Sequence, residues 1–88
     1  MSYKVEFMPK AVKQIKKLDK LHAKQITNWI SKNLVNCPNP YLHGKSLKGN
    51  LSEYWRYRVG DYRILAKIDS LKIKIFIFKI GNRKEIYG

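Results

Sequence analysis

Turn signals divide the second half of this 88-residue chain into three short segments that each have the pattern of a β-strand. The segments run from Glu53 to Val59, from Tyr62 to Ile68 and from Leu71 to Ile80, with Gly60-Asp61 and Asp69-Ser70 between them. Two-residue connections built from Gly, Asp and Ser join antiparallel neighbours. The sequence therefore predicts an antiparallel β-meander, which restricts the chain to folds that cover one face of such a sheet.

The first half of the chain supplies the elements for that cover. Tyr3 to Phe7 alternates as a short strand does, and Pro9 stands at a first helical position. A helical pattern from Pro9 breaks near Asp19, and a second runs from about His22 to Asn36. We expect a polar loop from Tyr41 to Asn50. The order β-α-α-β-β-β predicts an α+β domain, with an N-terminal strand and a helical hairpin packed on the meander.

The size and charge of the chain limit its function. We expect a single domain, residues 1–88, with a core too small to enclose a deep pocket, so that a site would lie on an open face or groove. Nineteen Lys and Arg against six Asp and Glu give a net charge of +13. Self-repulsion of this size destabilises a compact protein and indicates a polyanionic partner, either nucleic acid or an acidic protein.

Other classes of protein are disfavoured. The longest apolar run, Ile75 to Phe78, is too short to span a bilayer, and the N-terminus lacks the apolar stretch of a signal peptide. Cys37 is alone, so we expect no disulfide framework and a cytoplasmic location. His22 and His43 have no partners at ligand spacing, so we expect no metal and no cofactor.

The arginines are concentrated in and beside the meander, although lysines outnumber them fifteen to four. Alternation places Arg56, Arg58 and Arg63 on the sheet face opposite the apolar residues, and Arg83 follows the last strand. Solvation and edge protection do not require arginine in place of lysine, whereas the guanidinium fork matches phosphate oxygens. The pattern favours a phosphate-binding face. Tyr87, near Arg83, is a phenol that can stack on a base or donate a proton.

Lysines extend the positive surface over the helices and the loop. The first helix carries them on one side, where they are either the solvated face of an amphipathic helix or a sequence-independent phosphate footprint, and both interpretations stay open. Candidate nucleic-acid contacts are Lys13, Lys16, Lys17, Lys45 and Lys48.

These residues resemble the RelE/ParE superfamily of bacterial type II toxins over essentially the whole chain. The resemblance is carried by YKVEF and AVKQIKKL in the first half, by LKGNLSEYWRYRVGDYRILAKI in the centre and by IFIFKIGNRKEIY at the end. It implies a small sheet packed on a helical hairpin, an active face on the sheet, and a cognate acidic antitoxin encoded alongside.

Two branches of that superfamily differ in activity. RelE-like members are ribosome-dependent endoribonucleases that cut mRNA in the A site, whereas ParE-like members lack the catalytic basic set and inhibit DNA gyrase. Arg56 and Arg58 match the two basic strand positions of the RelE type, Arg63 the arginine of the next strand, and Arg83 and Tyr87 the tail residues. This match favours an mRNA interferase. A gyrase inhibitor, or a relic that binds antitoxin without cutting, remains an alternative.

The resemblance also implies a reaction that needs no metal. The 2′-OH attacks the adjacent phosphate and leaves a 2′,3′-cyclic phosphate and a 5′-OH, while cations stabilise the charge on phosphorus. RelE-type enzymes carry strand lysines that can act as general base, but Arg56 and Arg58 do not deprotonate. Candidates for the base are His43, Lys45, Glu85 and Tyr87.

Overall fold

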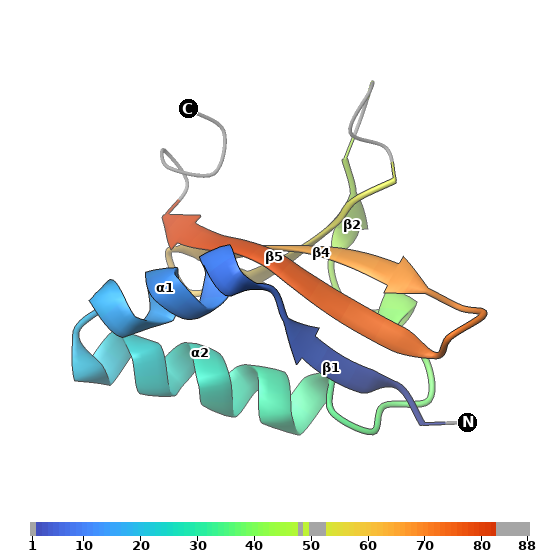
Figure 1. The fold of residues 1–88 in the computed structure, drawn as a ribbon, viewed down its shortest axis with the longest axis horizontal. Coiled ribbons are helices and arrows are strands. Elements are labelled where there is room, and N and C mark those ends of the chain that lie inside the picture. Colours follow the sequence, from blue (N-terminus) through green and yellow to red (C-terminus); the bar gives the residue numbers. More distant parts are fainter. Residues whose placement is uncertain (1, 48, 50–52, 83–88) are drawn as a thin grey trace.

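One mixed sheet with the strand order β1-β5-β4-β3-β2 organises the computed structural model, which describes residues 2–47, 49 and 53–82 (Figure 1). The strands are β1 (Lys4–Phe7), β2 (Lys45–Ser46), β3 (Trp55–Val59), β4 (Tyr62–Asp69) and β5 (Lys74–Asn82). The helices are α1 (Pro9–Lys17) and α2 (Lys20–Asn33), and a short 3-10 turn spans Pro40–Leu42. Figure 1 shows α1 and α2 together on one side of the sheet, so the predicted α+β architecture is confirmed.

Strand β5 lies inside the sheet, between β1 and β4. It is antiparallel to β4 and parallel to β1, with Val5 opposite Ile75. The apolar residues on both sides of β5 suggested the central position, which β4 occupies; β5 is an interior strand with a neighbour on each edge. The parallel pairing with β1 joins segments about 70 residues apart, and local sequence patterns carry no signal for it.

The core lies between the helices and one face of the sheet. Ile26 and Ile30 from α2 are fully or nearly fully buried against Tyr57 of β3 and Ile64 of β4. The alternation of the meander strands predicted this inward face correctly. Complete burial of such side chains contributes roughly 1.5–3 kcal/mol each, so this layer dominates the stability of the domain.

A β-bulge adjusts the inward face of β5. Adjacent residues Leu65 and Ala66 of β4 pair with residues two apart on β5, so that Phe78 is an extra residue on that strand. Strict alternation would turn Ile80 out of the core, whereas the bulge changes the parity and Ile80 is 2% exposed. The bulge thus keeps both halves of β5 packed on the helices.

The start of α2 differs from the expected one by two residues. Asp19 is the N-cap: its carboxylate accepts a hydrogen bond from the His22 backbone N–H at 3.4 Å and contacts His22 Nδ1 at 2.5 Å. A capping aspartate lets the helix begin at Lys20. The helix ends at Asn33 because Asn36 takes a left-handed conformation with φ 60°.

In the part of the chain that the structure describes, no helix is long and apolar enough to cross a membrane.

Two loop predictions were wrong. The expected polar loop from Tyr41 to Asn50 contains β2, whose two polar residues give no strand signal and which forms only by pairing with β3. The turn after β4 is also longer than Asp69-Ser70. It runs over residues 70–73, where Asp69 Oδ1 accepts hydrogen bonds from Leu71 N at 3.1 Å and Lys72 N at 3.0 Å.

Candidate functional site

The β3–β4 hairpin brings three of the predicted arginines onto one face. Arg58 is directly opposite Arg63, and Arg56 is opposite Leu65. Directly opposite residues share a face, and the intervening pair Tyr57 and Ile64 is buried under the helices. The arginine face is therefore the one that α1 and α2 leave uncovered, as strand alternation predicted.

Strand β2 adds a third cation to Arg56 and Arg58. Lys45 pairs directly with Arg56, and a cavity of about 240 Å³ is lined by Gly44, Lys45, Arg56 and Arg58. The described lining contains three cationic side chains and no carboxylate. Such a set attracts an anion of phosphate size, because several guanidinium and ammonium donors converge on one small volume. We call this volume the cation pocket.

A glycine lets the loop close on β3 at this point. Gly44 has φ 77°, and a Cβ there would overlap the Arg56 carbonyl oxygen and lie 2.8 Å from Trp55 Nε1. The indole of Trp55 donates a hydrogen bond to the His43 carbonyl at 2.6 Å. Gly44 was not among the predicted site residues, although a glycine immediately before Lys45 is a visible signal for close backbone approach.

The 3-10 turn Pro40–Leu42, which precedes Gly44 in the chain, is anchored to the core. The Tyr57 hydroxyl is buried and donates a hydrogen bond to the Pro40 carbonyl at 2.7 Å, and burial raises the pKa of this phenol. The ring of Tyr41 packs edge-on against Trp55, with centroids 5.0 Å apart. These contacts fix the loop that carries Lys45 relative to the strand that carries Arg56.

Arg63 shares the arginine face but is not openly displayed there. Its side chain is 8% exposed, whereas Arg58 is exposed. Arg63 Nη1 turns back and donates hydrogen bonds to the carbonyls of Gly60 (3.5 Å) and Tyr62 (3.3 Å). Arg58 Nε also reaches the Gly60 carbonyl at 3.5 Å. Like charges directly opposite each other destabilise a strand pair, and these carbonyls offset part of that repulsion.

The other candidate residues that the structure describes do not line the cation pocket. Lys13, Lys16 and Lys17 are exposed on α1, on the helix side of the sheet. The ring of His43 packs edge-on against Trp29 at 5.8 Å and does not line the pocket. Lys48, Arg83, Glu85 and Tyr87 lie outside the described residues. Within those residues, no three His, Cys, Asp or Glu gather in a way that could hold a metal ion.

The chemistry available to the pocket follows from its donors. Arginine remains protonated at any physiological pH, so Arg56 and Arg58 can bind and neutralise a phosphate but cannot accept a proton. Among the described residues that line the pocket, only Lys45 has a nitrogen that can release its proton and then act as a base. The arrangement is suited to binding a phosphodiester and stabilising charge that develops on it.

Comparisons with known proteins agree with this fold. A family model described as the ParE toxin of the type II toxin–antitoxin system parDE matches residues 5–87. Comparison with curated protein sequences found no match.

Solved structures match over nearly the whole chain. The RelBE2 toxin–antitoxin complex from Mycobacterium tuberculosis has a TM-score of 0.85 at 25% identity, covering 94% of this chain and 93% of that one. A RelB–RelE antitoxin–toxin complex from Methanococcus jannaschii has a TM-score of 0.68 at 28% identity, covering 92% and 93%. A mutant of the E. coli toxin RelE in the free state has a TM-score of 0.77 at 21% identity, covering 99% and 92%.

Proposed function

This chain belongs to the ParE toxin family of type II toxin–antitoxin systems, and from the cation pocket we propose that it is a RelE-like mRNA interferase, a ribosome-dependent endoribonuclease that cuts mRNA in the A site. The cation pocket is the observation that carries the proposal, because a protein that cleaves a phosphodiester needs fixed cations around the reacting phosphate. Cleavage of mRNA during translation inhibits protein synthesis.

The proposed reaction is a transesterification within the RNA. The 2′-hydroxyl gives up its proton as its oxygen forms a bond to the adjacent phosphorus. The bond from phosphorus to the 5′-oxygen breaks, and that oxygen takes up a proton and leaves as a hydroxyl, so protons balance over the reaction. Arg56 and Arg58 hold the phosphate oxygens, and the buried Arg63 adds positive potential on the same face. The ribosome supplies in-line geometry by positioning the mRNA.

Removing a pocket arginine tests the proposal. We expect Arg58→Ala to lower A-site cleavage about 10²–10³-fold, the usual loss when one charge-stabilising donor is removed. The matched control is Lys32→Ala, which removes an exposed cation from α2 on the other side of the sheet. Cleavage is measured by primer extension on an mRNA translated with purified ribosomes. Unchanged cutting by the Arg58 variant, or no A-site cuts by the wild type, would refute the proposal.

Two substitutions of Lys45 separate binding from proton transfer. Lys45→Arg retains a cation opposite Arg56, whereas Lys45→Met removes it at similar length. If Lys45 only binds phosphate, the arginine variant should cut at close to the wild-type rate and the methionine variant should be impaired. If Lys45 accepts the 2′-OH proton, both should be impaired, because arginine does not deprotonate.

We also propose an acidic antitoxin as the partner of this chain. The relatives from M. tuberculosis and M. jannaschii were crystallised as toxin–antitoxin complexes, and a net charge of +13 favours an acidic protein. Co-expression of the gene with a short acidic neighbouring reading frame should give a complex that co-purifies and does not cut mRNA. A neighbouring product that neither binds nor inhibits the toxin contradicts the pairing.

The description of the matching family model favours one alternative, inhibition of DNA gyrase. A gyrase inhibitor would trap cleaved plasmid DNA in a reaction with purified gyrase and leave translated mRNA intact. An interferase gives the opposite pair of results. Running both assays with the same preparation of the protein decides between the two functions.

A further inference from the structure

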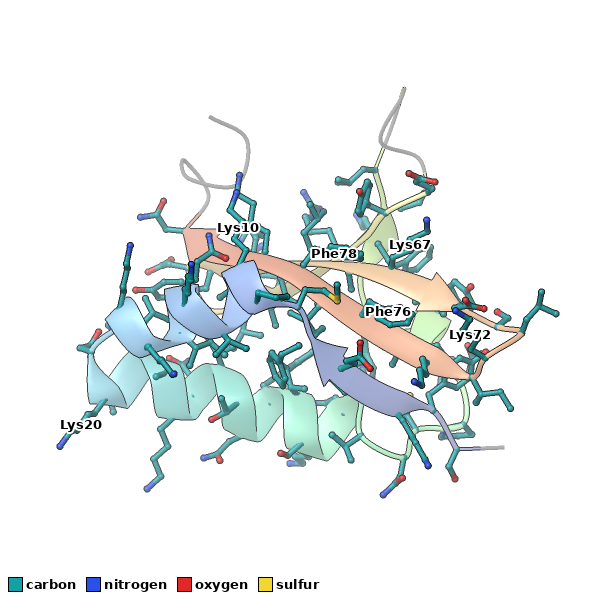
Figure 2. All side chains as sticks on the ribbon, in the orientation of Figure 1. Lys10, Lys20, Lys67, Lys72, Phe76 and Phe78 are labelled. Carbon is teal, nitrogen blue, oxygen red and sulfur yellow. The ribbon has the colours of Figure 1, made fainter. Side chains whose placement is uncertain are left out.

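Three aromatic side chains lie on the face that carries the cation pocket. Tyr54, immediately before β3, packs edge-on against Phe78 with ring centroids 5.8 Å apart, and Phe78 is followed by Phe76 at 6.5 Å. All three rings are partly exposed. In Figure 2, Phe78 and Phe76 lie over β5 with Lys67 and Lys72 beyond them. We call Tyr54, Phe78 and Phe76 the aromatic row.

The row exists because of the way β5 alternates. Ile75 and Ile77 are buried under the helices, so Phe76 projects to the opposite face, where it pairs with Lys67 of β4. Phe78 is the extra residue of the bulge. Rings grouped on the side of a sheet without helices bury little apolar surface within the protein, and a patch of this kind marks a binding surface.

The far end of the row opens into a hollow. It has a volume of about 490 Å³, and its lining includes Phe76, Phe78 and Leu71 together with Lys67, Lys72 and one acidic residue, Asp69. Leu71, at the tip of the β4–β5 turn, is 97% exposed. Lys67 also lies 3.7 Å from Glu53, but an exposed pair of this kind contributes little and leaves the lysine available.

The row and the cation pocket form one continuous path. Tyr54 is two residues from Arg56 and four from Arg58, which corresponds to about 13 Å along an extended strand. From one end to the other, the path offers guanidinium groups, three rings and then two lysines beside Asp69. Single-stranded nucleic acid is bound by this alternation, with cations on the phosphates and aromatic faces on the bases.

We propose that the aromatic row is a stacking track for the bases of single-stranded RNA next to the phosphate held in the cation pocket. The inference rests on the proposed function, because the pocket fixes where the strand begins. A peptide is the other class of ligand that an apolar hollow could bind. RNA is favoured because its bases stack on aromatic rings and its phosphates bind in the cation pocket. An aliphatic side chain of a peptide would need only an apolar surface and no aromatic ring.

Leucine substitutions separate these two ligands. Phe78→Leu and Phe76→Leu keep an apolar side chain but remove the π-face, and Phe78→Trp enlarges it. The probe is a 12-nucleotide RNA carrying 2′-O-methyl groups, which block cleavage, and one 2-aminopurine, whose fluorescence falls when it stacks. Binding to the full-length protein at low salt is followed by anisotropy and by 2-aminopurine quenching, with thermal melts to verify folding.

For the wild type and Phe78→Trp we expect binding with quenching. Each leucine variant should bind about 5–150-fold more weakly and lose the quenching, which is the usual effect of removing one stacking ring. Leucine variants that bind and quench as the wild type does overturn the track, as does a wild type without measurable RNA binding. If those variants keep RNA binding but lose an antitoxin that co-purifies with the wild type, the row is a protein-docking surface and the track is wrong.

The RNA-binding and quenching results can be interpreted separately from the A-site cleavage assay. Stacking without A-site cleavage leaves the track in place and removes the proposed function. If the wild type cleaves mRNA and the leucine variants stack RNA normally, the proposed function stands and the stacking track is wrong.

Discussion

At the scale of single residues, two glycines with similar backbones have different surroundings. Gly44 and Gly49 both have positive φ angles, 77° and 71°. A Cβ at Gly44 would collide with the backbone of Arg56, whereas a Cβ at Gly49 would meet nothing within 4 Å. The left-handed conformation costs a non-glycine residue roughly 1–2 kcal/mol in either place. The pair therefore isolates the cost of a close approach between two backbones.

We predict that Gly44→Ala destabilises the protein more than Gly49→Ala does. The additional cost should be about 1–3 kcal/mol in the free energy of unfolding, because β2 must move away from β3 to admit a methyl group. The same movement displaces Lys45 from Arg56, so A-site cleavage should also fall. Urea denaturation and primer extension on both variants measure the two effects. Equal destabilisation by the two alanines would show that the loop at Gly44 admits a methyl group with no additional free-energy cost.

At the scale of elements, α2 depends on a titratable cap. A hydrogen bond with the His22 side chain holds the pKa of the Asp19 carboxyl below its ordinary value. The folded state therefore binds this proton less readily than the unfolded state. The resulting stabilisation is fully present above the ordinary pKa of about 4, and it is lost as the pH falls through the folded value.

Asp19→Asn should remove that pH dependence. Asparagine also caps helices but does not titrate. We expect the wild type to lose stability relative to the asparagine variant as the pH is lowered from 5.5 to 2.5, with little change in the difference above pH 5. Urea denaturation of both proteins at each pH measures the free energies of unfolding. A constant difference across this range would mean that the Asp19–His22 contact contributes nothing to folding.

The elements also differ in how far the sequence determines them. The β3–β4 hairpin was predictable because alternation and the Gly60-Asp61 turn are local, and they placed Arg58 and Arg63 on one face. Strand β2 was not, since Lys45 and Ser46 become a strand only through contact with β3. The burial of Arg63 was missed because alternation gives the face of a side chain but not its contacts, and Arg63 turns back to the carbonyls of Gly60 and Tyr62.

At the scale of the whole molecule, charge is in conflict with compactness. A net charge of +13 on 88 residues raises the free energy of the folded state through self-repulsion. Salt screens that repulsion, over a Debye length of about 10 Å at 0.1 M. Salt should therefore act in opposite directions on the folding and on the nucleic-acid binding of this protein.

We predict that the melting temperature of the isolated protein rises between 20 and 300 mM NaCl while its affinity for RNA or ribosomes falls steeply. The logarithm of the binding constant should fall linearly with the logarithm of the salt concentration, as expected for release of counterions. Scanning calorimetry and anisotropy titrations over the same salt series measure the two trends. A double variant, Lys16→Gln with Lys24→Gln, should show a smaller rise in melting temperature. Binding that does not respond to salt would mean that the lysines only keep the protein in solution.

The facing arginines of the β3–β4 hairpin make the stability of the folded protein depend on bound ligands. Arg58 and Arg63 face each other across one strand pair, and like charges in that position repel, so an anion bound on the arginine face reduces that repulsion. By mass action, such a ligand stabilises the folded state by RT ln(1 + [L]/Kd). An unoccupied molecule is therefore the form that opens most often and is most accessible to proteases. Its lifetime in a cell would then depend on how continuously its arginine face is occupied.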